Sequence, residues 1–265
     1  MKKLKIYCVT DKIKKDLERT NLILAGVGKE NFPSNYLSCN TKDNIFFKEK
    51  NYSELTFHYW FWKNILDINE DIWIGFCQKR RFWVKKNIQK SEINLHNCLL
   101  DTVPDEWSNY DSILCNPINI NNVKKMKIIK RGFKNLIKHP SILFDKNKRS
   151  LKLHFDMHHG YGNLDKAINV MNEKDREDFR VFVNTSLSYN PHIMFIAKPK
   201  VINEWFKDLF TWLFECEKIF GFENLKGYDT ERLYAYLAER YLSFWFNKYT
   251  KTIHWPWKFF DSSGM

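Results

Sequence analysis

Short apolar runs recur along the chain and are separated by longer stretches of mixed character. Residues 4–10, 72–77, 110–115 and 193–197 have strand length and are rich in β-branched or aromatic side chains. The run at 72–77 is apolar almost throughout, which is typical of a strand covered on both faces of a sheet. We therefore predict a sheet with residues 72–77 in its interior.

Apolar residues at helical spacing occupy much of the remaining chain. They predict helices over residues 12–25, 165–171, 175–183, 201–220 and 230–246. A further helix is expected after Ser53, which has the residue type of a helix N-cap. Residues 119–152 are rich in Lys and Asn and predict a loop with short elements.

The alternation of strands and helices predicts an α/β fold with a helical C-terminal portion. At 265 residues the chain fits one domain with a sizeable core, and we expect two halves within it, 1–118 and 119–265. Hydrophobic residues make up 44% and aromatic residues 17%, which excludes a disordered chain.

The chain is basic, with 43 Lys and Arg against 31 Asp and Glu and a formal net charge of +12. Such a charge favours nucleic acid, an anionic membrane or a phosphorylated small molecule as partner. The abundance of Lys, Asn and Ile is also what an AT-rich genome encodes, so the charge alone selects no partner.

The cysteines and the apolar segments indicate in which cellular compartment the protein is expected. The six cysteines are scattered without a Cys-x-x-Cys pair, which predicts reduced thiols. The first residues lack the pattern of a signal peptide, and no run approaches the ~20 apolar residues of a membrane span. We expect a cytoplasmic protein, with peripheral contact at the inner face of the membrane left open. Residues 255–260, Trp-Pro-Trp-Lys-Phe-Phe, would dock on the fold itself or at that interface.

Three segments carry a family pattern. They are Asp43–Ile45 with Asn51–Asn64, then Ile74–Phe82, and the C-terminal half from Asn190 to Leu242. Together they resemble the glycosyltransferase-like proteins of capsular and exopolysaccharide clusters that form the family domain of unknown function 4422. The pattern departs at one place, because the His-Tyr that the family carries before its paired arginines is here Gln78-Lys79.

The resemblance implies a bacterial, GT-A-like nucleotide-sugar transferase in a single domain. Residues 1–118 would be its donor-binding half and residues 119–265 its acceptor-side half. The reaction implied is transfer of a hexose, with galactose favoured, from a nucleotide diphosphate sugar, with a UDP-sugar favoured. The acceptor would be a capsular, exopolysaccharide or lipopolysaccharide-type glycan, or a lipid-linked one.

Three consecutive cations, Lys79, Arg80 and Arg81, follow the interior strand. Ligands of α/β sheets bind outside the carboxyl ends of strands, and Arg matches phosphate oxygens bidentately. We predict that these residues bind the donor diphosphate; the alternative is a solvated basic turn. Thr10 and Asp11 end the first strand, where such folds receive the nucleotide base, or they form a simple turn.

Two residues of the Tyr- and Trp-rich helix are further donor-binding candidates. Glu54 stands at its start, where it would accept a bond from a sugar hydroxyl or favour the positive helix end. Lys63 stands at its end, where it would cap the helix or point into the site.

An acceptor hydroxyl needs a carboxylate to take its proton. The candidates are Asp111 at the start of a strand and Asp229 and Glu231 at the start of a helix; for Asp229 and Glu231 the alternative is an ordinary solvated helix. His158, His159 and His192 are the candidate acceptor-binding residues, with ordinary hydrogen-bonded histidines as the alternative.

The sequence has no Asp-x-Asp, the motif with which many GT-A transferases hold a metal. We expect no metal, with cations in its place, and leave open a Mn²⁺ or Mg²⁺ ion on dispersed carboxylates. His154, Asp156 and His158 would share one face if they lay on a strand, and would then resemble a metal site.

Two other functions compete with the transferase. One is nucleic-acid binding, which the charge and the aromatic content favour but which no recognisable motif supports. The other is an inactive scaffold of a polysaccharide assembly, which Gln78-Lys79 and the missing Asp-x-Asp favour.

Overall fold

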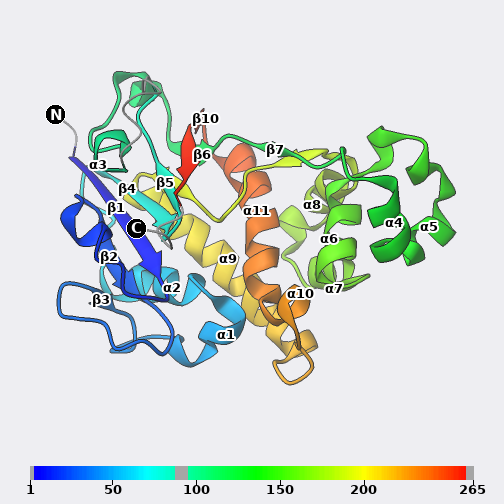
Figure 1. Cartoon of the computed structure of the whole chain (residues 1–265), viewed down its shortest axis with the longest axis horizontal. Helices are drawn as coiled ribbons and strands as arrows, with labels where there is room; N and C mark the ends of the chain where they lie inside the picture. The colour runs from blue at the N-terminus through cyan, green and yellow to red at the C-terminus, as the bar shows by residue number, and fades with distance from the viewer. Residues whose placement is uncertain (1–2, 87–94, 261–265) are drawn as a thin grey trace. The chain divides into compact units, whose positions relative to one another are not determined.

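The strand-length runs form a nine-stranded sheet in a computed structural model that describes residues 3–86 and 95–260 (Figure 1). Its strands are β1 (Lys3–Thr10), β2 (Ile23–Gly26), β3 (Leu37–Ser38), β4 (Ile72–Gln78), β5 (Arg81–Trp83), β6 (Ser112–Cys115), β9 (Phe195–Ala197), β10 (Thr252–Trp255) and β11 (Trp257–Phe259). The main path runs β10-β6-β9-β4-β1-β2-β3, and β5 connects β4 to β11. The interior position predicted for residues 72–77 is confirmed, since β4 lies between β1 and β9.

Most neighbouring strands on the main path run in parallel. β1 pairs in parallel with β2 and β4, and β10 pairs in parallel with β6. β9 is antiparallel to both of its neighbours, β4 and β6. The carboxyl ends of β1, β2, β4, β6 and β10 therefore share one edge of the sheet, which sets where a ligand site is to be sought.

Aromatic side chains cover both faces of this sheet. On one face the rings of Trp107 and Trp255 lie 5.3 Å apart and belong to a buried cluster with Trp73. On the other, Tyr7 of β1 lies 4.8 Å from Phe61 of α2 (Leu55–Asn64). Burial of each large apolar side chain contributes roughly 1.5–3 kcal/mol, so both faces anchor the sheet.

The chain divides into two compact units that do not follow chain order. The first comprises residues 1–116, 192–207 and 246–265, and the second comprises 117–191 and 208–245. β9 and β10 belong to the first unit because they pair with β4 and β6. The predicted boundary between the halves 1–118 and 119–265 lies near residue 116, where the first unit is first left. Residues 192–207 and 246–265 return to the first unit because they contain strands that pair with its sheet.

The second unit is largely helical. It contains α4 (Lys125–Arg131), α5 (Phe133–Lys138), α6 (Leu151–His159), α7 (Asn163–Asn169), α8 (Glu173–Thr185) and α10 (Tyr228–Glu231), parts of α9 (Pro199–Phe220) and α11 (Leu233–Tyr249), and the hairpin of β7 (Ile118–Asn119) with β8 (Ser188–Tyr189). The helices predicted over 165–171, 175–183 and 201–220 are confirmed. The short elements expected within 119–152 are helices and 3-10 turns.

Two local predictions are wrong, and a third is confirmed over most of its length. Residues 12–25 contain a 3-10 turn (Leu17–Arg19) and then β2, because pairing with β1 overrides the local helical pattern. Ser53 does not cap a helix; it has φ 53° and separates α1 (Glu49–Tyr52) from α2. The helix predicted over 230–246 is interrupted at Arg232, between α10 and α11.

The remaining helix of the described chain is α3 (Leu95–Cys98), in the first unit. All six cysteines are buried, and the structure joins none of them in a disulfide. Within residues 3–86 and 95–260, no helix combines the length and the apolar character needed to cross a membrane.

Candidate active site

The strand order changes direction between β1 and β4. β2 and β3 lie beyond β1 on one side, while β9, β6 and β10 lie beyond β4 on the other. In open α/β sheets ligands bind at such a switch point, in the crevice outside the carboxyl ends of the strands. β1 ends here at Thr10, which Asp11 follows, and β4 ends at Gln78, which Lys79 follows.

An ion pair joins the two strand ends. The Lys79 ammonium contacts the Asp11 carboxylate, and both side chains are partly exposed, at 21% and 36%. The Lys79 N–H donates to the Val9 carbonyl at 3.1 Å, which extends the β1–β4 ladder by one residue. Thr10 is buried, and its hydroxyl accepts from the Lys12 N–H at 3.1 Å. Thr10 therefore shapes the turn, while Asp11 and Lys79 are presented to solvent.

Gln78 connects four parts of the first unit. Its side-chain N–H groups donate to the Glu54 carboxylate and, at 2.9 Å, to the His192 carbonyl. Its Oε1 accepts from Arg81 Nη1 at 3.0 Å. Because an amide donates and accepts at once, this single side chain brings Glu54 at the start of α2, Arg81 of β5 and His192 to the end of β4. Gln78 is not among the site residues predicted from the sequence, although its departure from the family pattern marks the position.

Backbone geometry holds His192 in this cluster. His192 has φ 74°, an uncommon conformation for a residue with a side chain, and Ile193 follows at φ 49°. The His192 ring packs edge-on against Trp257, with centroids 4.7 Å apart. The carbonyl that Gln78 binds is therefore fixed by a turn, and the His192 ring is held by an aromatic contact.

The two arginines occupy the turn from β4 into β5. The Arg80 carbonyl accepts from the Phe260 N–H at 3.0 Å, and the Arg80 side chain is exposed. The Arg81 guanidinium lies 5.9 Å from the centre of the Phe259 ring. With Lys79 they place three positive charges on consecutive residues at the switch point.

Two predicted residues of the first unit lie away from this cluster. Lys63 lies over the Trp62 ring at 3.7 Å, and nine residues of helix separate it from Glu54, about 14 Å. Asp111 directly precedes β6. Ser112, the first residue of β6, is level with Ile74 of β4, because both pair with Ala197 of β9. Ile74 lies four residues, or roughly 13 Å, before Gln78 along β4. The structure therefore does not bring Lys63 or Asp111 to the switch point.

Asp111 has local partners instead. Its carboxylate accepts from the Lys251 N–H at 3.2 Å and lies 3.8 Å from the Lys198 ammonium. These contacts fix the start of β6 beside β10.

The second unit brings three other predicted residues together. His158 and His159 end α6, and Asp229 lies on α10 with Glu231 as its last residue. His159 Nδ1 bonds to the Asp229 carbonyl at 3.0 Å, and its ring stacks on Tyr236 at 3.7 Å. The Asp229 carboxylate lies 3.5 Å from Arg131 of α4.

The histidines of α6 are neutral at physiological pH. Burial, and next the charge of Arg240, lowers the pKa of His154 to about 2 and that of His159 to about 3. Burial also lowers the pKa of His158. His158 Nδ1 bonds to the His154 carbonyl at 2.8 Å, so it carries the proton and Nε2 is left as an acceptor. A neutral imidazole of this kind can bind or deprotonate a hydroxyl.

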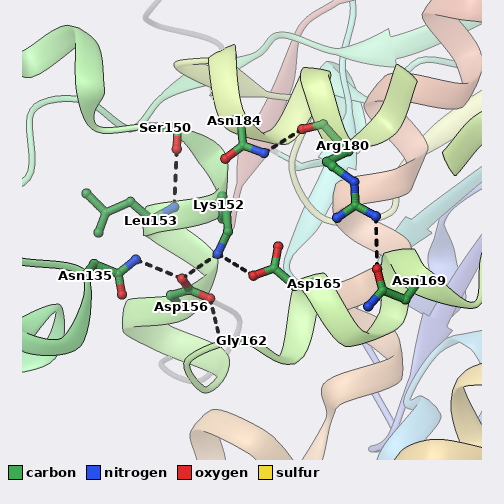
Figure 2. A network of polar contacts seen from close by, with 10 residues as sticks. All are labelled: Asn135, Ser150, Lys152, Leu153, Asp156, Gly162, Asp165, Asn169, Arg180 and Asn184. Atoms are coloured by element: carbon green, nitrogen blue, oxygen red, sulfur yellow. Dashed lines mark hydrogen bonds and ion pairs between the residues drawn. The ribbon is translucent and has the colours of Figure 1, made fainter. Parts of the chain in front are cut away.

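The predicted His154–Asp156–His158 face does not form, because these residues lie on helix α6 and not on a strand. Asp156 is buried and accepts from Asn135 (2.8 Å), Lys152 (3.0 Å) and the Gly162 N–H (3.1 Å) (Figure 2). A helix turns about 200° in two residues, which separates Asp156 from the two histidines. Among the residues that the structure describes, no group of three or more His, Cys, Asp or Glu side chains could hold a metal ion.

A cavity of about 560 Å³ lies beside this network in the second unit. Its lining is polar and basic: Lys138, Lys148, Lys152, Tyr161, Asp165, Asn135, Asn147 and Asn184 are among the residues that contribute. Figure 2 shows Lys152 reaching between Asp156 and Asp165, 2.8 Å from the latter. No local pattern predicts this cavity, because its walls come from several helices and turns.

Comparisons with known proteins bear on the whole chain. A family model described as Domain of unknown function (DUF4422) matches residues 5–251, and no curated protein matches the chain. Among solved structures, the chain is similar to the apo structure of WbbM, described as a bifunctional glycosyltransferase, with a TM-score of 0.70 and 19% sequence identity. The similarity covers 98% of this chain and 46% of that one, so the chain spans about half of its neighbour's length. The likeness confirms the predicted α/β glycosyltransferase-like fold.

Proposed function

Since this chain belongs to the family described as domain of unknown function 4422, we propose that it is a glycosyltransferase that uses a nucleotide diphosphate sugar. The observation that carries the proposal is the polar cluster at the switch between β1 and β4. Three cations and two carboxylates gather there, where α/β folds bind nucleotides.

In this proposal Lys79, Arg80 and Arg81 bind the donor diphosphate. Positive groups placed in advance stabilise the negative charge that develops on the leaving diphosphate. Asp11 and Glu54 carry acceptor oxygens at the same edge, suited to ribose or sugar hydroxyls. Thr10 supports the turn that presents Asp11.

The carboxylates of this cluster already have positive or amide partners. Asp11 contacts Lys79, and Glu54 accepts from Gln78. A Mn²⁺ or Mg²⁺ ion on Asp11 would have to displace the Lys79 ammonium. The donor set therefore fits charge neutralisation by Lys and Arg better than a dedicated divalent site.

We place the acceptor in the second unit. His158 and His159 are neutral and lie with Asp229, which remains our candidate base with Glu231 as its neighbour. The cavity near Tyr161 offers amides, hydroxyls and an aromatic ring, the groups that bind sugars. A galactose-type hexose from UDP, transferred to a surface glycan, is the reaction that the family resemblance favours.

A nucleotide screen tests the donor site. The purified protein should gain thermal stability with one of UDP, GDP or CMP or its sugar conjugate, since a ligand that binds only the folded state stabilises it. Arg80→Ala with Arg81→Ala should weaken nucleotide affinity at least ~30-fold, because charged hydrogen bonds contribute about 1.5–3 kcal/mol each. Lys85→Ala, at a surface ion pair with Asp101, is the control and should bind as wild type. Equal affinity in the arginine double variant would refute the assignment.

A second function, an inactive scaffold, rests on Gln78 in place of the family's His. Gln78 is fully engaged by Glu54, His192 and Arg81 and has no titratable proton. Nucleotide binding without hydrolysis or transfer of any sugar nucleotide would favour the scaffold. Release of the nucleotide diphosphate from one donor establishes the transferase.

A further inference from the structure

The net positive charge of the chain is concentrated in one segment. Residues 119–150 contain ten Lys and Arg and one acidic residue, Asp145, a net of +9. Since the whole chain carries +12, the other 233 residues carry only +3. Genomic bias towards Lys would spread along the sequence, so this concentration is a local property of α4, α5 and the turns that follow them.

The same segment exposes large apolar side chains. Met126 and Ile129 of α4 are three residues apart, and Phe133 and Ile137 of α5 are four apart, so each pair shares one face of its helix. Their side chains are exposed, by as much as 66% at Ile137, and Phe144 is 80% exposed. We call these five residues, with the exposed cations among them, the α4–α5 surface.

The cations and the apolar residues of this surface are intermixed. The exposed cations of the two helices are Lys125, Lys127, Lys130, Arg131, Lys134 and Lys138. The Lys125 ammonium lies 5.4 Å from the centre of the Phe144 ring, which brings the turn after α5 beside α4. Figure 1 shows α4 and α5 next to each other.

The surface is held rigidly from beneath. Arg149 is buried and donates to the carbonyls of Ile142 (3.1 Å), Asn121 (3.2 Å), Val123 (3.0 Å) and Leu143 (3.1 Å). Ile128 and Ile142 pack inward with Leu153 and Met157. The apolar residues of the α4–α5 surface therefore face outward, whereas the nearby Ile128 and Ile142 are buried in a core.

We propose that the α4–α5 surface docks this protein on an anionic lipid membrane. Apolar side chains on one side of short helices, flanked by Lys, enter the boundary between headgroups and acyl chains, while the cations meet anionic headgroups. A nucleic acid would satisfy the cations, but it would leave aliphatic Met126, Ile129 and Ile137 in water. Membrane docking is independent of the proposed donor site, because no residue of the α4–α5 surface lies at the β1–β4 switch.

The C-terminal aromatic segment is not a competing membrane surface. Trp255 is buried in β10 and donates to the Val84 carbonyl at 2.9 Å, and β11 pairs with β5. Of the two alternatives that its sequence left open, the structure shows docking on the fold.

Vesicle flotation of the full chain, without any sugar nucleotide, tests the proposal. The protein should bind vesicles of phosphatidylcholine with phosphatidylglycerol and bind phosphatidylcholine alone much more weakly. Phe133→Ser with Ile137→Ser should lower the vesicle affinity at least ~10-fold, because the two side chains no longer enter the acyl region. Lys130→Glu with Lys134→Glu should abolish the preference for anionic lipid.

The matched control is Phe47→Ser with Val181→Ser, which removes two exposed apolar side chains outside the α4–α5 surface and should bind vesicles as wild type. Unchanged thermal stability in the apolar variants separates loss of docking from loss of folding. Absence of binding to any vesicle overturns the proposal. The proposal is also overturned, in favour of nucleic acid, if the wild-type protein binds an oligonucleotide but binds vesicles only weakly. In that case the lysine variant would lose oligonucleotide binding and the Phe133/Ile137 variant would keep it.

Discussion

At the scale of single residues, Gln78 decides how the candidate donor site is assembled. Its amide donates to Glu54 and His192 and accepts from Arg81, so it fixes both a carboxylate and a guanidinium. Gln78→Leu keeps the size of the side chain and loses all three bonds. We expect nucleotide affinity to fall on the order of 100-fold, since three lost bonds at about 1 kcal/mol each amount to about 3 kcal/mol.

Gln78→His is the informative comparison. An imidazole keeps one N–H donor and one ring acceptor, so it can serve Glu54 and Arg81 together. Nucleotide affinity, measured by calorimetry, should stay within about 3-fold of wild type for His. Equal losses for Leu and His would show that Gln78 acts by shape and not by hydrogen bonding.

The predicted site residues divide clearly at this scale. Asp11, Glu54, Lys79, Arg80, Arg81 and His192 gather with Thr10 at the strand ends. Lys63 and Asp111 do not, because helix length and strand register carry them away from that edge. Position at a strand end predicted Thr10, Asp11 and the three cations at 79–81, whereas Glu54 was predicted from a helix start and His192 as an acceptor-binding residue. Position along the chain contains no information on the register that excluded Asp111.

At the scale of elements, α4 and α5 depend on a residue outside them. Arg149 donates four hydrogen bonds to carbonyls of the segments before α4 and after α5. Arg149→Met leaves these acceptors without their charged donor, and we expect a loss of about 3 kcal/mol in the stability of this region. Hydrogen exchange of residues 121–143 measures it directly.

A neighbouring substitution controls for charge. Lys148→Met removes a positive charge from an exposed side chain whose ammonium bonds to Ser141 Oγ at 3.0 Å. Its effect should stay within about 0.5 kcal/mol. If exchange in 121–143 responded equally to both variants, net charge and not the Arg149 bonds would stabilise α4 and α5.

At the scale of the whole molecule, buried neutral histidines in both units link stability to pH. Burial lowers the pKa of His58 to about 3, and its Nδ1 has no partner among the described residues. His154 and His159 have pKa values of about 2 and about 3. In the unfolded chain each imidazole takes up a proton near its ordinary pKa of 6.5. The unfolded state therefore binds more protons below that pH.

Stability should consequently fall as the pH drops below about 6.5, and go on falling until the folded pKa values are reached. Between about pH 6.5 and about pH 5, each of these histidines lowers the free energy of unfolding by roughly 2 kcal/mol. Urea unfolding at about pH 7.5 and pH 5 should show it, and His58→Leu should reduce the difference by about 2 kcal/mol. Phe57→Leu, a core change without a titrating group, should lower stability equally at both pH values. A pH difference unaltered by His58→Leu would contradict the neutral buried state of His58.

Local periodicity or residue type is enough to predict the strands at 4–10 and 72–77, the long helix over 201–220 and the basic turn at 79–81. Tertiary structure alone decided that residues 12–25 pair as a strand, that His154 and Asp156 diverge on a helix, and that β9 and β10 rejoin the first unit. It also decided that Gln78 connects the site. These features depend on contacts between residues far apart in the chain, whose free energy outweighs local preference and leaves no periodic trace in the sequence.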